Sequence, residues 1–96
     1  CICMSHFFID AIKRRAIISI TYDHEVRAIE PHLLGIDKKG HVALRAYQVS
    51  GPSGTGWRIF HVNEITMHQD TGRSFQQPRP LYNPNDKGMT RVIARV

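Results

Sequence analysis

The sequence has few cysteines and no long apolar run. Its only cysteines, Cys1 and Cys3, are spaced too closely for a disulfide and lack a second ligand pair for zinc. The longest apolar runs, such as Ala16 to Ile18, are too short to span a bilayer. Basic residues follow the apolar N-terminal stretch instead of preceding it, unlike in a signal peptide. We therefore expect a reducing, cytoplasmic setting and no membrane partner.

Acidic residues are scarce at the C-terminal end. The chain carries 13 Lys and Arg against 8 Asp and Glu, a formal net charge of +5. Residues 1–70 are nearly balanced, whereas residues 71–96 contain five cationic side chains and only Asp86 as an anion. This excess favours anionic partners such as nucleotides or nucleic acid.

Motifs for catalysis and metal binding are also missing. No two of the six histidines have the i, i+4 spacing of a helical zinc motif. The glycine-rich segment 51–56 lacks the Lys-Ser/Thr pair and the following helix of a phosphate loop. The sequence has no supported Ser-His-Asp order and no plausible pair of catalytic carboxylates. We predict a protein that is not an enzyme, with no catalytic residue, no metal site and no cofactor.

Apolar periodicity predicts one helix followed by short strands. Ser5 is expected to cap a helix that runs to about Arg15, with Phe8 and Ile12 on one face. Alternation predicts strands over residues 17–22, 26–36 (interrupted or ended near Pro31), 42–47, 57–61 and 64–68, the last with Ile65 and Met67 facing inward. Segment 50–56 is expected to be a mobile loop. The pattern predicts a mainly β fold, a small SH3-like or Sm-like barrel of about five strands with one N-terminal helix.

The chain is expected to divide into a barrel domain and an arm. The domain covers residues 5–70, and residues 71–96 form a C-terminal arm rich in Pro and Arg. The arm is predicted to pack irregularly through Phe75, Leu81 and Tyr82, because its prolines exclude a long helix. Its weakly alternating end, residues 89–96, is a candidate edge strand.

Short motifs in a fixed order resemble the WYL domain of bacterial regulators. They are Asp10-Ala11-Ile12, Ile18-x-Ile20-x-Tyr22, Arg27-x-Ile29-x-Pro31, Leu44-Arg45-Ala46-Tyr47, Arg58-Ile59-Phe60, Ile65 and Thr71-x-x-x-Phe75, within about residues 6–75. The Trp-Tyr-Leu run that names the family is replaced by Val42-Ala43-Leu44. The resemblance implies a ligand-sensing barrel that binds a nucleotide or single-stranded nucleic acid in a basic groove, as part of transcription regulation. A helix-turn-helix does not fit in this chain, so the resemblance implies a sensor that either stands alone or is excised from a larger regulator, with a helix-turn-helix regulator as a candidate partner.

Four residues are predicted to bind the ligand. Arg45 and Tyr47 alternate onto one face of their strand, expected to face solvent, where a guanidinium suits a phosphate and an aromatic ring suits a base. The resemblance places Arg27 and Arg58 in the same groove. The alternative is that these arginines form ordinary ion pairs with glutamates of the chain.

Two other functions stay open on the sequence alone. One is an Sm-like homo-oligomer whose strands pair edge to edge around a ring and grip RNA. The other is a protein–protein adaptor that docks a partner through the arm, residues 71–96. The mass measured by size-exclusion chromatography distinguishes the oligomer from the other functions. The orientation of Arg27, Arg45 and Arg58 tests whether they share one groove.

Overall fold

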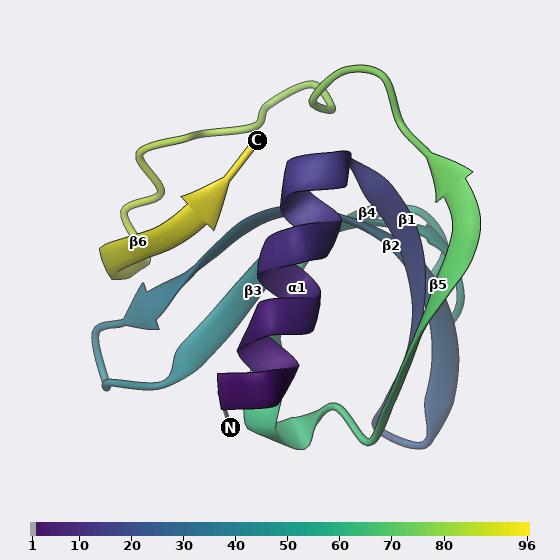
Figure 1. Cartoon of the computed structure of the whole chain (residues 1–96), viewed down its shortest axis with the longest axis horizontal. Coiled ribbons are helices and arrows are strands. Elements are labelled where there is room, and N and C mark those ends of the chain that lie inside the picture. Colours follow the sequence, from purple (N-terminus) through teal and green to yellow (C-terminus); the bar gives the residue numbers. More distant parts are fainter. Residues whose placement is uncertain (1) are drawn as a thin grey trace.

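One N-terminal helix and six antiparallel strands make up the fold (Figure 1). The computed structural model describes residues 2–96, with side chains described from Ser5 onward. The elements are α1 (Ile2–Arg14), β1 (Ala16–Tyr22), β2 (Glu25–Asp37), β3 (Val42–Ser50), β4 (Gly56–His61), the 3-10 turn η1 (Val62–Glu64), β5 (Met67–Ser74) and β6 (Met89–Arg95). The prediction of a mainly β fold with one leading helix is confirmed. Among residues 2–96, no helix is long and apolar enough to cross a membrane.

The 13-residue strand β2 organises the sheet. Its first half pairs with β1 as far as Ile29, its second half pairs with β6 from Leu33 onward, and β3 also pairs along it. The strand order is β4-β3-β2-β1-β5, and within the described chain β4 and β5 do not pair with each other. The sheet is therefore open, and the predicted closed barrel is not shown. The sheet has six strands because the candidate edge strand at the C-terminus forms, as β6, and pairs with the second half of β2.

Helix α1 covers one side of the sheet, here called the helix face. Phe8, Ala11 and Ile12 lie three and four residues apart and are at most 1% exposed. They pack on the inward side chains of the strands, which include Ile18, Ile20, Ile29, Leu44, Ala46 and Phe60. The helix begins at Ile2, so the prediction that Ser5 caps it is wrong; neither Pro nor Gly precedes Ser5 to stop the helix there.

A bulge in β2 redirects its side chains. Opposite β3, the register shifts between Pro31 and Leu33, so that His32 is the extra residue. Pro31 was expected to interrupt or end this strand, but it lies inside β2, at the bulge between the stretches that pair with β1 and β6. The bulge aims both His32 and Leu33 away from the helix face.

The opposite side of the sheet, here called the arm face, is covered by residues 75–88. Leu33 and Ala43 are fully buried there and Met89 is 9% exposed, with Tyr82 packed against them. This face was predicted to be exposed to solvent, and that prediction is wrong because the arm folds back over β2 and β3. In the arm, Phe75 is buried and Leu81 is 91% exposed. Phe75 and Tyr82 therefore dock as predicted, whereas Leu81 does not.

The chain between β4 and the arm differs from the prediction. Residues 62–64 form η1, and β5 begins only at Met67 and continues past residue 70 to Ser74. Ile65 is buried as expected, but Met67 is 67% exposed at the start of the edge strand. Because the 3-10 turn occupies residues 62–64, the strand begins later in the sequence than predicted. The inward orientation predicted for Met67 is wrong.

His32 anchors the arm. Its ring stacks on Phe75 at 4.9 Å, and Trp57 and Tyr82 pack around it at 4.8 and 5.2 Å between ring centroids. The backbone N–H of Arg79 donates to Nε2 (3.1 Å), so Nδ1 carries the proton and donates to the carbonyl of Glu30 (2.7 Å). His32 is thus a neutral, fully buried ring with both nitrogens bonded, and burial lowers its pKa.

Candidate anion-binding site

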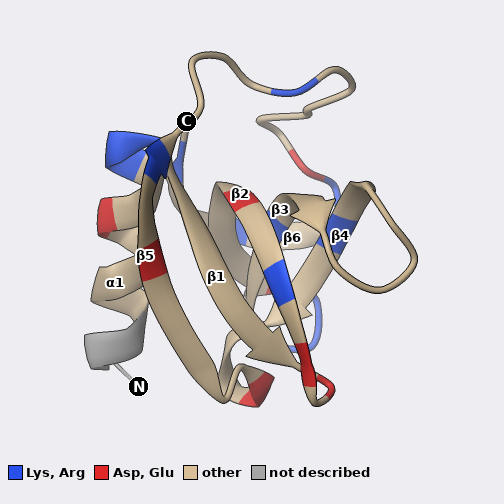
Figure 2. Cartoon of the chain, turned by 90° about the vertical axis from the view of Figure 1, so that its right-hand side faces the viewer, with Lys and Arg blue, Asp and Glu red and all other residues tan. Residues whose placement is uncertain are grey.

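Two of the predicted arginines lie together on the helix face. Residues directly opposite each other in antiparallel strands point to the same side of the sheet. Arg27 in β2 lies opposite the buried Ile20, and Arg58 in β4 lies opposite the buried Ala46. Both side chains therefore lie on the side that α1 covers. Figure 2 shows a basic segment on β2 and another on β4.

Gln48 links the two arginines. It is fully buried in β3, and its Oε1 accepts a hydrogen bond from Arg27 (3.1 Å) while its Nε2 donates to the carbonyl of Gly54 (2.8 Å). Arg58 donates to the same carbonyl (3.1 Å) and to that of Ser53 (3.2 Å). The β3–β4 loop, expected to be mobile, is thus held by side chains from two strands.

Glycine lets this loop pass close to both arginines. Gly51 (φ 134°) and Gly56 (φ 149°) have backbone conformations that other residues rarely adopt. A Cβ at Gly51 would lie 3.1 Å from Cγ of Arg27, and one at Gly56 would lie 2.9 Å from a terminal nitrogen of Arg58. Glycine is therefore favoured at both positions by the backbone conformation, and at Gly51 also by the close approach of Arg27.

Neither Arg27 nor Arg58 has a carboxylate partner in the part of the chain that the structure describes. Other arginines do: Arg45 pairs with Asp86 (2.8 Å) and Arg79 with Glu30 (2.7 Å). Nε of Arg27 is in addition a buried donor without an acceptor. A half-buried guanidinium bonded only to neutral groups retains its charge and favours an incoming anion.

An aromatic ring lies beside Arg27. Its guanidinium carbon is 5.8 Å from the ring centre of Tyr22 and 5.7 Å from that of Phe60, within the range of cation–π attraction. Phe60 is buried, whereas Tyr22 is half-buried and donates a hydrogen bond to Glu64 (3.4 Å). Burial raises the pKa of Tyr22, so its hydroxyl is neutral near pH 7.

Arg45 and Tyr47 lie on the arm face, opposite Ile59 and Trp57 of β4. Arg45 is neutralised by Asp86, and the guanidinium carbon of Arg79 lies 4.6 Å from the ring centre of Tyr47. The prediction that the four residues line one groove is wrong, because the odd residues of β3 point away from the side that holds the other two arginines. The binding role of Arg27 and Arg58 stays a prediction, and Arg45 and Tyr47 lie outside their site, on the arm face.

The residue of the candidate site that sequence reasoning missed is Gln48. It follows Leu44 and Ala46 at two-residue spacing, so the alternation already places it on the inward face of β3. A buried amide at the end of such a strand needs polar partners, and a loop rich in glycine offers exposed carbonyls. An inward-facing glutamine followed by a glycine-rich loop was therefore the feature of the sequence that could have indicated this contact.

The arm face has a cavity of about 300 Å³ that is lined by two other arginines. Arg73 and Arg79 line it together with Thr71, but Glu30 accepts two hydrogen bonds from Arg79 at 2.7 and 3.0 Å. An anion there would compete with a buried carboxylate, which makes this cavity a poorer site than the pair on the helix face.

Comparison with known proteins identifies no relative. The chain matches no protein-family model, and neither a curated protein nor a solved structure matches it significantly. Its function is therefore inferred from the geometry of the site.

Proposed function

We propose that the chain is a non-enzymatic ligand-sensing module of the WYL type that binds a nucleotide or a short single-stranded nucleic acid. In this proposal the open sheet is a variant of the SH3-like barrel, and the module serves bacterial transcription regulation beside a helix-turn-helix partner. One observation carries the proposal: Arg27 and Arg58 share one face, one polar network and no carboxylate.

The chemistry of binding follows from the present partners of the two arginines. Their acceptors are an amide oxygen and backbone carbonyls, which are neutral. A phosphate oxygen is a charged acceptor, and hydrogen bonds to charged groups contribute about 1.5–3 kcal/mol, more than neutral ones. Exchanging a loop carbonyl for a phosphate is therefore favourable. Tyr22, beside Arg27, takes the place that was predicted for Tyr47 as the ring that meets a base.

The test is binding of fluorescent single-stranded oligonucleotides and a panel of cyclic dinucleotides, measured by anisotropy at several salt concentrations. Arg27→Ala and Arg58→Ala should each weaken binding by about tenfold or more, which corresponds to one charge-assisted hydrogen bond. Arg45→Ala is the matched control, because it removes an arginine that is already paired with Asp86. For a single-stranded ligand, each substitution that removes an arginine–phosphate bond should lower the salt slope by about 0.7.

Two outcomes contradict the proposal. If Arg45→Ala weakens binding as much as Arg58→Ala, the ligand responds to overall charge and not to this site. If no oligonucleotide or nucleotide binds at low salt, the adaptor function becomes the better explanation. Size-exclusion mass, measured on the same samples, identifies a ring-forming Sm-like oligomer.

A further inference from the structure

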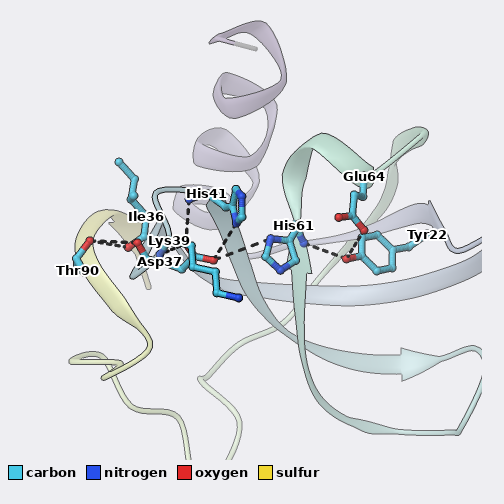
Figure 3. A network of polar contacts seen from close by, with 8 residues as sticks. All are labelled: Tyr22, Ile36, Asp37, Lys39, His41, His61, Glu64 and Thr90. Carbon is cyan, nitrogen blue, oxygen red and sulfur yellow. Dashed lines mark hydrogen bonds and ion pairs between the residues drawn. The ribbon is translucent and has the colours of Figure 1, made fainter.

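Two imidazoles and one carboxylate meet near the turn between β2 and β3 (Figure 3). Asp37 ends β2, His41 precedes β3, and His61 ends β4. Oδ2 of Asp37 lies 3.6 Å from Nδ1 of His41 and 4.0 Å from Nδ1 of His61. One ligand atom from each of the three residues lies within 4.8 Å of the other two. Asp37 and His41 are four residues apart in one turn, whereas His61 lies 20 residues further along the chain, and the sequence alone did not bring the three together.

The turn orients the carboxylate toward the imidazoles. Oδ1 of Asp37 accepts hydrogen bonds from the backbone N–H groups of His41 and Lys39, both at 2.9 Å. With Oδ1 occupied, Oδ2 is the oxygen that faces the two rings.

His61 is positioned by a second set of contacts. Its backbone N–H donates to the hydroxyl of Tyr22 (3.2 Å), which in turn donates to Glu64 (3.4 Å). Tyr22 packs edge-on against Phe60 at 4.9 Å, next to His61 in β4. These contacts hold the backbone at His61, from which the imidazole reaches Asp37.

We propose that Asp37, His41 and His61 bind a divalent transition-metal ion, of which Zn²⁺ is the representative. Two imidazoles and a carboxylate are a donor set that suits zinc and its neighbours, whereas Ca²⁺ and Mg²⁺ prefer oxygen ligands alone. Ligand atoms about 2.0–2.1 Å from a tetrahedral Zn²⁺ lie about 3.3 Å apart. The observed separations are longer, 3.6 and 4.0 Å from the carboxylate and at most 4.8 Å for any pair, so the imidazoles, which are 51% and 34% exposed, must rotate to close on an ion.

The site has three protein ligands, which leaves a tetrahedral ion one position for water or an exogenous ligand. His41 also lines a cavity of about 200 Å³, between the start of α1, the β2–β3 turn and η1. Space for an outside ligand therefore adjoins the site. The bound ion would also tie the end of β2 to the end of β4, two strands that do not pair with each other. The metal ligands and the arginine pair are different residues, although Tyr22 contacts both Arg27 and His61, so separate substitutions test the two proposals.

The test uses the full chain with Zn²⁺, by competition against a chromophoric chelator, and with Co²⁺, whose visible absorption reports tetrahedral ligands. We expect one Zn²⁺ per chain and a rise in melting temperature when it binds. His41→Gln, His61→Gln and Asp37→Asn should each weaken binding by about tenfold or more, because each removes one of three bonds. Asn retains the oxygen that caps the turn, so Asp37→Asn should still fold.

Two controls make the result specific. His24→Gln changes an exposed histidine in the turn at the opposite end of β2 and should leave zinc affinity unchanged. Replacing Cys1 and Cys3 by Ser removes the thiols, and that variant should still bind one equivalent. The proposed site is wrong if His41→Gln and His61→Gln each bind zinc as tightly as the wild-type chain. It is also wrong if the variant without Cys1 and Cys3 no longer binds zinc. An unchanged affinity in Asp37→Asn with weakened binding in the histidine variants would likewise overturn the three-ligand arrangement.

Discussion

Replacing His32 by Phe tests what holds the arm on the sheet. Phe keeps a ring that can stack between Phe75 and Trp57 but removes both hydrogen bonds of the imidazole. The carbonyl of Glu30 and the N–H of Arg79 then lose their partners, at a cost of about 1–3 kcal/mol each. We expect the free energy of unfolding to fall by about 2–6 kcal/mol. A chain of this length has a total stability of about 5–15 kcal/mol, so the loss is large.

Acid should narrow that difference in stability. Above pH 6.5 the imidazole is neutral in both the folded and the unfolded chain. Below pH 6.5 the unfolded chain takes up a proton that folded His32, with its lowered pKa, does not. The wild-type protein therefore loses stability as the pH falls from 6.5 toward the folded pKa, whereas His32→Phe lacks this contribution. The stability gap between the two proteins should narrow over that range.

Urea unfolding from pH 7.5 to 4.5 measures both effects. Trp57 is the only tryptophan and lies beside His32, so its fluorescence reports the arm, and circular dichroism reports the sheet. His24→Gln changes an exposed histidine and should alter neither the stability nor its pH dependence. The reasoning is refuted if His32→Phe unfolds within about 0.5 kcal/mol of wild type at pH 7.5, or keeps the full acid slope.

Three further substitutions test the sheet and the arm by the same unfolding assay. Gly35→Ala should cost about 1–3 kcal/mol, because a Cβ there would lie 2.5 Å from the carbonyl oxygen of Arg91 and displace β6; wild-type stability would contradict the β2–β6 pairing. Asp86→Ala should cost about 1 kcal/mol by leaving Arg45 unpaired at 29% exposure, and no change would show that the pair contributes nothing. Leu81→Ser should change stability by less than about 0.5 kcal/mol, since the side chain is 91% exposed, and a larger loss would mean that Leu81 is buried in solution.

The local elements were predictable because they follow from alternation. Leu44 and Ala46 face the helix and Ala43 faces away, as the two-residue period of β3 requires. The open sheet was not predictable, because it depends on where β2 exchanges β1 for β6, two strands that lie near opposite ends of the chain. Local sequence does not report such a choice of partner.

The site shows the same division between local and long-range information. Alternation correctly places Arg45 and Tyr47 on one face, but their environment comes from Asp86 and Arg79, which reach them only because the arm folds back. Alternation within one strand tells which of its residues share a face. It does not tell which residues of three different strands share that face, because this depends on the pairing register, and the prediction failed there. In the register of β3 and β4, Arg58 lies opposite Ala46, so it shares a face with Gln48 and not with Arg45. A shift of one residue between these strands would move Arg58 to the arm face, which is why the groove had to await the structure.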